Sequence, residues 1–341
     1  MTLSIKQNFF LLLLLTSSIS AFGQFPVSVD SFYNYIKGNS IYRNSVNWTT
    51  IDNNFSTNIK AAKSLNDTAD CFVKVFDALG DYHSNFNLNG KYYSNNPSFD
   101  DATLSWLNPL VIKSKETTNI IFAKKIFKQI AYIRIPSIQA YSQNDINKYS
   151  QAIFDTIAKL SSTSYKGFII DVRLNGGGNI YPMLTGLSNF IDNSTVAYET
   201  DYNDKTVREW KIKNRNFFIG GYQTTNLVLK SDKKLNNIPV VVLIGPVTMS
   251  SGSMVAIAFK NRPNTITVGE PTADGYSTSN GYFQFAPALT GNLASFYVAD
   301  RKKTIYKNSV TPDKVIYRGD NFDNLLLDKK IAYAIKWLNK K

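Results

Sequence analysis

The sequence predicts an α/β fold built on a largely parallel sheet. From residue 127 to the end of the 341-residue chain, short apolar runs alternate with helix-periodic segments, which is typical of parallel α/β domains. Two of these runs, Phe168 to Val172 and Val240 to Ile244, are apolar except at Asp171, as buried strands require. Glycines follow both runs, at Gly176 to Gly178 and at Gly245. We therefore expect buried strands that end in loops.

The remaining elements of the core follow in chain order. Further strands are predicted at Tyr132 to Ile135 and at Thr265 to Val268, and a polar, hairpin-like region near residues 197 to 225. Helices are predicted by apolar periodicity at Ile146 to Leu160, around Leu184 to Ile191, at Ser251 to Lys260 and at Asn321 to Lys340.

The chain before the core divides into three parts. Residues 1–23 combine one positive charge, Lys6, with the apolar run Phe9 to Leu15 and small residues before Gln24, as in a secretory signal peptide. Residues 24–86 are predicted to be mostly helical. Residues 87–126 are predicted to form an exposed loop, up to residue 101, and a pair of short strands at Val111 to Ile126. The core is then 127–341. We expect export to the periplasm or medium of a bacterium, and no membrane-spanning segment in the mature chain.

Composition limits the partners of the protein. The net charge is +13, but the lysines are scattered singly or in pairs and form no basic stripe, so we expect no nucleic-acid partner. Cys71 is the only cysteine, so the chain has no internal disulfide. We expect this small residue to be buried. No His/Cys/Asp cluster has ligand spacing, so neither a metal nor an organic cofactor is expected.

Ser250 lies where the strand Val240 to Ile244 turns into the helix that begins at Ser251. A hydroxyl at this position can project into a cleft beside unpaired backbone N–H groups, which is the environment that an acyl-transfer nucleophile needs. The alternative is that Ser250 is only an N-cap, a role that serine often takes.

The two other informative segments are the glycine loop and the segment around His83. Gly176 to Gly178 would let a ligand approach the backbone closely; the alternatives are a flexible turn and a phosphate-binding loop, although no Gly-Lys-Ser/Thr follows. His83, the only histidine in the chain, follows an amphipathic helix that Gly80 is expected to end. It is either a structural residue or, on such a loop, a general base.

In this order, the three segments resemble those of the tail-specific (C-terminal processing) serine peptidase family, most closely its tricorn-core-like branch. The matching residues are Leu79, Asp81, His83 and Ser84, then Asp171, Arg173, Asn175, Gly177 and Gly178, then Thr248 and Ser250, then Gly269 to Thr272, then Pro312 and Asp313. The resemblance implies a ClpP/crotonase-like core with an N-terminal helical cap. Only about 40 residues separate Phe86 from the strand at Ala131, too few for the PDZ domain that many members insert there.

The chain departs from the family at three positions. Gly275 stands where many members have a catalytic lysine, Tyr82 where the tricorn-like branch has a supporting serine, and Tyr306 near the position of a supporting glutamate. The lysine dyad is therefore absent, and the histidine base of the tricorn-like branch corresponds to His83.

The resemblance implies a serine peptidase that acts on a peptide or protein. Ser250 would be the nucleophile and His83 the base, and the backbone N–H groups of Gly177 and Ser251 would bind the oxyanion. Three residues are candidates for orienting His83: Glu270, Ser84 and Asp81. The alternative is a non-catalytic member that binds a peptide or apolar ligand in the same cleft. A third reading, an acyl-CoA enzyme of crotonase type, is disfavoured by the export signal.

Overall fold

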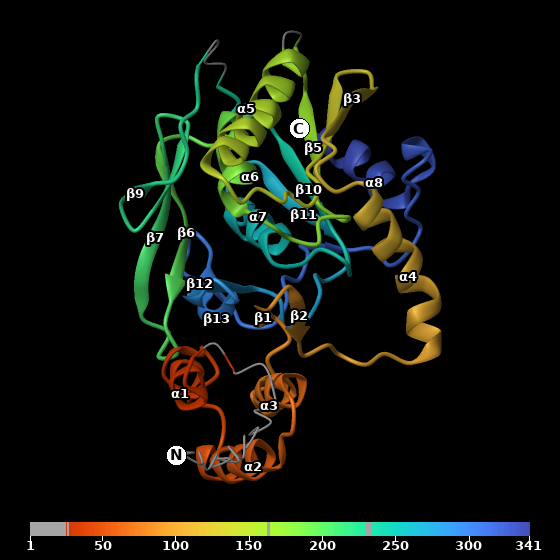
Figure 1. Ribbon diagram of the computed structural model, residues 1–341. Coiled ribbons are helices and arrows are strands. Elements are labelled where there is room, and N and C mark those ends of the chain that lie inside the picture. Colours follow the sequence, from red (N-terminus) through yellow and green to blue (C-terminus); the bar gives the residue numbers. More distant parts are fainter. Residues whose placement is uncertain (1–24, 26, 162–163, 230–233) are drawn as a thin grey trace, which may run out of the picture.

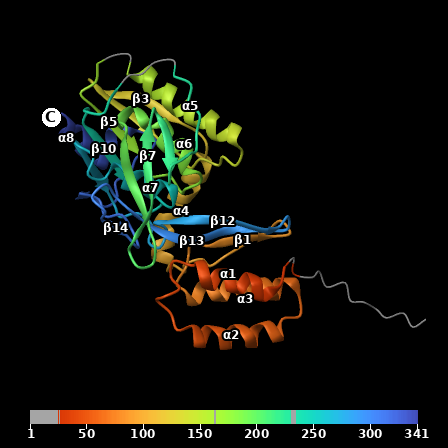
Figure 2. The same ribbon diagram turned by 90° about the vertical axis from the view of Figure 1, so that its left-hand side faces the viewer.

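The computed structural model describes residues 25, 27–161, 164–229 and 234–341. It places an α/β core at one end of the molecule and three helices at the other, with an antiparallel sheet between them (Figures 1 and 2). The predicted signal peptide, residues 1–23, lies outside the described residues. No helix in the described ranges combines the length and the apolar character needed to cross a bilayer.

The core contains a sheet of six strands among the described residues, in the order β15-β11-β10-β5-β4-β3. These strands are β15 (Lys314–Val315), β11 (Thr265–Gly269), β10 (Val240–Ile244), β5 (Gly167–Asp171), β4 (Ile130–Arg134) and β3 (Phe122–Phe127). All neighbouring pairs are parallel except β3 with β4. The predicted α/β core with a largely parallel sheet is therefore confirmed.

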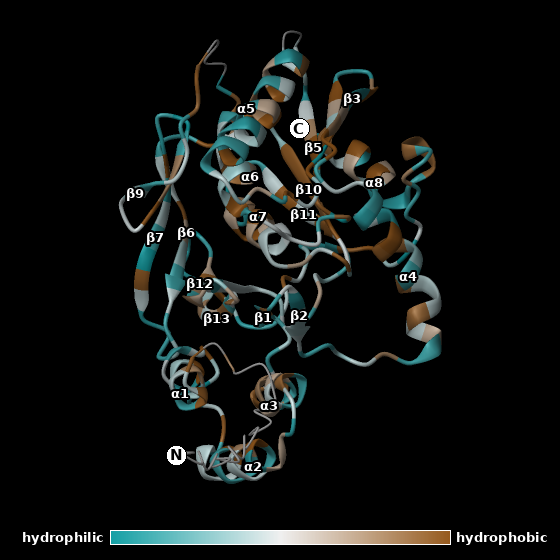
Figure 3. Cartoon of the chain, in the orientation of Figure 1, coloured by the Kyte–Doolittle hydropathy of each residue, from teal (hydrophilic) through white to brown (hydrophobic). Residues whose placement is uncertain are grey.

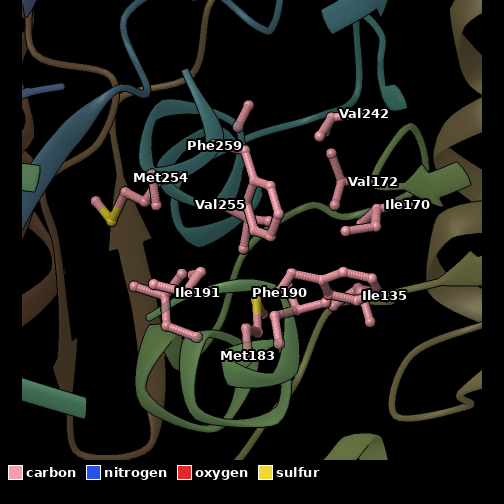
Figure 4. Close-up of a cluster of buried hydrophobic side chains, with 14 of the residues drawn as sticks. Ile135, Ile170, Val172, Met183, Phe190, Ile191, Val242, Met254, Val255 and Phe259 are labelled. Carbon is pink, nitrogen blue, oxygen red and sulfur yellow. The ribbon is translucent and has the colours of Figure 1, made fainter. Parts of the chain in front are cut away.

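Helices bury both faces of this sheet. The helices are α5 (Gln143–Leu160), α6 (Ile180–Gly186), α7 (Ser251–Phe259) and α8 (Lys329–Leu338). In β10, Val240, Val242 and Ile244 pack with α5, α6 and α7, whereas Val241 and Leu243 pack with α8. Burial on both faces explains why the strand is apolar throughout, and the sheet is correspondingly hydrophobic in Figure 3. Figure 4 shows side chains of α6 and α7 meeting those of the strands.

A second sheet has nine strands among the described residues, ordered β2-β1-β13-β6-β7-β8-β9, with β12 and β14 also paired to β13. The strands are β1 (Asn85–Leu88), β2 (Lys91–Ser94), β6 (Ser194–Thr200), β7 (Thr206–Lys213), β8 (Asn216–Ile219), β9 (Tyr222–Gln223), β12 (Thr278–Ala286), β13 (Leu289–Ala299) and β14 (Ile305–Tyr306). Strands β6 to β9 account for the predicted hairpin-like region. The long hairpin of β12 and β13 was not predicted from the sequence.

The N-terminal helices are α1 (Val29–Asn39), α2 (Trp48–Ala61) and α3 (Leu65–Ala78). Asn47 and Ser64 cap α2 and α3 with side-chain hydrogen bonds to backbone N–H groups. Phe32 and Phe72 form an aromatic cluster with side chains of β1 and β12, which fixes the helices against the second sheet. Cys71 is buried in α3, as expected.

Two predictions of local structure were wrong. Residues 87–126 are not a loop followed by a pair of strands. Strands β1 and β2 form a hairpin across the start of the predicted loop, and Val111 lies within helix α4 (Asp101–Glu116). Of the two strands predicted between Val111 and Ile126, only β3 is present. Asp100 caps α4, and this helix signal outweighed the β-branched residues near the end of the helix. The described part of this region holds no PDZ domain.

The tail helix was predicted from Asn321, but it begins at Lys329, after a 3₁₀ turn at Leu325–Leu327. It begins there because Asp328 accepts hydrogen bonds from the N–H groups of Lys330 and Ile331.

Candidate active site

A cavity of about 880 Å³ lies between the two sheets. His83, Gly178 and Ser250 all line it, although they come from three distant segments of the chain. Its remaining wall is supplied by the β1–β2 hairpin, by β6 to β8, by the start of α6 and by β12. The structure therefore brings the three segments that sequence analysis singled out to one concave site, the usual setting for binding and catalysis.

Ser250 has a strained backbone conformation at the N-terminus of α7. Its φ of 51° and ψ of −122° are unusual for a residue with a side chain and cost about 1–3 kcal/mol. Its N–H donates to the carbonyl of Tyr276 at 3.0 Å. Ser250 occupies the N-cap position of α7, but its hydroxyl makes no capping hydrogen bond to the helix. Strain of this kind places a hydroxyl at the apex of a sharp strand-to-helix turn.

The glycine loop packs directly against Ser250. A Cβ at Gly177, whose φ is +108°, would lie only 2.7 Å from the Cβ of Ser250, so only glycine fits there. The N–H of Gly177 donates to Asn175 Oδ1 at 2.9 Å. Among the described residues, the N–H groups of Gly178 and Ser251 have no hydrogen-bond partner. The hydroxyl of Ser251 donates to the carbonyl of Gly178 at 2.7 Å, which joins the loop to the start of α7.

The backbone of His83 is fixed by Asp81. The Asp81 carboxylate accepts the N–H groups of His83 and Ser84, both at 2.9 Å, and the hydroxyl of Ser84. The hydroxyl of Ser84 in turn accepts the N–H of Ala294 on β13. Of the three candidates for orienting His83, Asp81 and Ser84 thus act on its backbone, and no hydrogen bond joins either to its ring.

The ring of His83 is oriented by a threonine. Its Nδ1 lies 2.7 Å from the hydroxyl oxygen of Thr278 on β12. The hydroxyl of Thr278 donates to Asn280 Oδ1 at 3.0 Å, and the side-chain amide of Asn280 donates to the carbonyl of His83 at 3.1 Å. When Nδ1 carries the proton and donates to Thr278, Nε2 is left as the basic nitrogen.

Burial lowers the pKa of His83 to about 4. Burial disfavours the charged imidazolium, and no carboxylate bonds to this ring among the described residues to offset that effect. The imidazole is therefore neutral across the physiological pH range, the state in which it can accept a proton.

Glu270 does not contact His83. Its carboxylate accepts a hydrogen bond from Lys330 Nζ at 2.7 Å, and both side chains are buried. Tyr306, near which the family's supporting glutamate was expected, donates its hydroxyl to Asp300. Gly275 packs against the ring of Tyr82. Two of the three positions at which the chain departs from the family are thus in contact with each other.

Lys330 and Glu270 belong to a largely buried charge cluster, which Asp320 links to Arg173. Arg173, which is 2% exposed, bonds to the carboxylates of Asp171, Asp320 and Asp328 at 2.6 to 2.7 Å. Arg173 stands two residues after the end of β5 and precedes the glycine loop. The cluster therefore ties the end of a central strand to the start of α8. Within the described ranges, no group of three or more His, Cys, Asp or Glu is placed to hold a metal ion.

Four residues of this site were not predicted from the sequence: Thr278, Asn280, Glu199 and Arg208. Thr278 and Asn280 alternate along β12 and so share one face, but a hydroxyl and an amide two residues apart carry no chemical signature. Glu199 and Arg208 face each other across β6 and β7, a pairing that depends on the register of two strands.

Several known proteins are similar to this chain. The nisin-resistance protein of Lactococcus lactis subsp. lactis is 31% identical over 180 residues, which are 52% of this chain and 55% of that protein. The chain thus matches only about half the length of this relative.

Two solved structures share the fold. A lipoprotein from Streptococcus agalactiae has a TM-score of 0.68 and 20% identity, over 92% of this chain and 95% of that chain. The photosystem II D1 C-terminal processing protease has a TM-score of 0.53 and 13% identity, over 85% and 92% of the two chains. The model of peptidase family S41 matches residues 129–316, more than half of the sequence, and the chain therefore belongs to this family.

Proposed function

We propose that this chain is an exported serine peptidase in which Ser250 is the nucleophile and His83 the general base. The observation that carries the proposal is the shared cavity. The hydroxyl of Ser250 makes no capping hydrogen bond and stands on a strained turn, and the cavity that Ser250 lines is also lined by His83, the chain's only histidine. Export is supported by the N-terminal signal pattern and by the description of one structural relative as a lipoprotein.

In the proposed reaction, the oxygen of Ser250 attacks the carbonyl carbon of a peptide bond while His83 Nε2 takes its proton. The N–H groups of Ser251 and Gly178 would bind the oxyanion that forms. We assign Gly178 rather than the predicted Gly177, because Asn175 already occupies the Gly177 N–H. His83 then donates the proton to the leaving amine. A water molecule, deprotonated by His83, hydrolyses the acyl-enzyme and restores Ser250.

Thr278 would take the place of the acid that supports the histidine in many serine hydrolases. Its hydroxyl can accept the Nδ1 proton and fix the tautomer, but it carries no charge to stabilise an imidazolium. The chain would thus work with a histidine that is well oriented and weakly basic, in agreement with the lowered pKa.

Covalent labelling by a fluorophosphonate probe tests the proposal. We expect stable modification at Ser250, located by mass spectrometry, because the probe reports an activated serine. The labelling rate should rise with pH through a midpoint near 4, because deprotonation of His83, whose pKa is about 4, generates the base. A midpoint at 6.5 or above would contradict the assigned environment of His83.

A non-catalytic binding protein is the second candidate. The absence of a carboxylate on the His83 ring among the described residues is the observation that favours it. An unlabelled Ser250 in a folded chain that still binds peptides would establish this function in place of the first.

Replacing Thr278 by valine should lower kcat by about 10-fold to 100-fold with little change in KM, because the ring of His83 loses the partner that fixes its tautomer. Thr278→Ser keeps the hydroxyl and should retain most of the activity. The measurement is the rate of peptide cleavage or probe labelling for both variants. Equal losses in the two would show that packing of the methyl group, and not the hydrogen bond, is what matters.

A further inference from the structure

Glu199 and Arg208 form an ion pair in the wall of the cavity. Glu199 on β6 and Arg208 on β7 stand opposite each other in the strand register, and Arg208 Nε donates to Glu199 Oε2. The hydroxyl of Ser279 donates to the other carboxylate oxygen, Oε1, at 2.6 Å. Glu199 is completely buried, and both of its oxygens are occupied. It is therefore a support for Arg208 and is not itself offered to a ligand.

The outer edge of Arg208 remains available. Its side chain is 41% exposed. Its guanidinium carbon lies 4.7 Å from the centre of the Phe296 ring, so the guanidinium packs against the ring in a cation–π contact. Among the described residues, its two terminal nitrogens, Nη1 and Nη2, have no hydrogen-bond partner. Two parallel N–H donors on a fixed plane match the two oxygens of a carboxylate.

The charged side chains of the cavity lining, apart from the neutral His83, are those of Arg208 and Glu199. Among the described residues that line the cavity, Arg208 is the only lysine or arginine and Glu199 the only aspartate or glutamate. Because Arg208 and Ser279 already occupy both oxygens of Glu199, the free end of this ion pair is the pair of terminal nitrogens of Arg208. The net charge of +13 on the chain adds a long-range attraction for anions. We propose that Arg208 is a specificity residue that binds a carboxylate of the peptide substrate, with Glu199 as the residue that positions it.

This inference rests on the proposed function, since it names a subsite of the same cleft. A carboxylate can be supplied by the C-terminus of the peptide or by an aspartate or glutamate side chain. Both would bind the same edge of the guanidinium, so the experiment must separate the two sources.

The test uses the full chain carrying Ser250→Ala, so that bound peptides are not consumed. Three hexapeptide libraries are passed over the immobilised protein, and retained peptides are identified by mass spectrometry. The first library has free C-terminal carboxylates and no acidic side chains. The second has C-terminal amides and no acidic side chains, and the third has C-terminal amides with one aspartate or glutamate.

We expect the first or the third library to be retained over the second, and the preference to fall about 10-fold to 100-fold when Arg208→Met is added. Arg208→Lys keeps the charge but loses the planar fork and should retain part of the preference. Lys211→Met is the matched control, because it removes a cation from the same strand outside the cavity lining. It should leave the preference unchanged.

Equal retention of all three libraries would overturn the inference, as would a preference that survives Arg208→Met or a preference for lysine- and arginine-containing peptides. Failure of the proposed function would show itself differently. In that case wild-type Ser250 would resist the fluorophosphonate probe while the carboxylate preference in binding remained.

Discussion

Replacing Ser250 by alanine is expected to lower kcat/KM by about 10⁶-fold, and His83→Ala should have a loss of similar size. Alanine at position 250 removes the attacking oxygen, and alanine at position 83 removes the group that takes its proton. The rates are measured on the peptide that the wild-type chain cleaves fastest in a fluorogenic panel. Because the two residues act as one unit, the double variant should be no slower than either single variant.

Ser253→Ala is the control for this experiment. Ser253 lies three residues further along the same helix, and its hydroxyl donates to the carbonyl of Thr248. Its loss should leave kcat/KM within a few fold of wild type. Unfolding midpoints of all variants are measured alongside. Activity that persists in a folded His83→Ala chain would remove His83 from the mechanism and leave another group as the base.

The largest loss of stability is expected from Arg173→Met, at about 3–5 kcal/mol of unfolding free energy. The side chain of Arg173 is held between three carboxylates, and two of these, Asp171 and Asp328, are fully buried. Removing the cation leaves these charges unpaired in a region from which water is excluded. Urea unfolding monitored by tryptophan fluorescence measures the effect.

Lys37→Met provides the comparison for Arg173→Met. Lys37 pairs with Asp52 at 2.9 Å, but both side chains are more than one third exposed, so its loss should cost only about 0–1 kcal/mol. If Arg173→Met proves too unstable to purify, Arg173→Lys keeps the charge and should fall between the two. Equal stability of Arg173→Met and wild type would mean that the buried carboxylates are protonated or solvated without their partner.

The buried strands were predictable because their sequences are determined by local patterns. Val240 to Ile244 is apolar throughout since helices cover both faces of the sheet. Ser250 was predictable as well, because a strand, a glycine and a helix start fix its place along the chain. The start of α8 was not predictable from apolar periodicity alone, because it is fixed by hydrogen bonds that the N–H groups of Lys330 and Ile331 donate to the Asp328 side chain.

What the sequence determined by itself was therefore the order of the core elements, the family and the three segments that meet at the cavity. Which side chains meet was decided only by the tertiary structure. Thr278 reaches the His83 ring across 195 positions of the chain, and Glu199 meets Arg208 only through the register of two strands. The physical reason is that periodicity records the burial of each residue, whereas a hydrogen bond or an ion pair depends on how distant segments are packed.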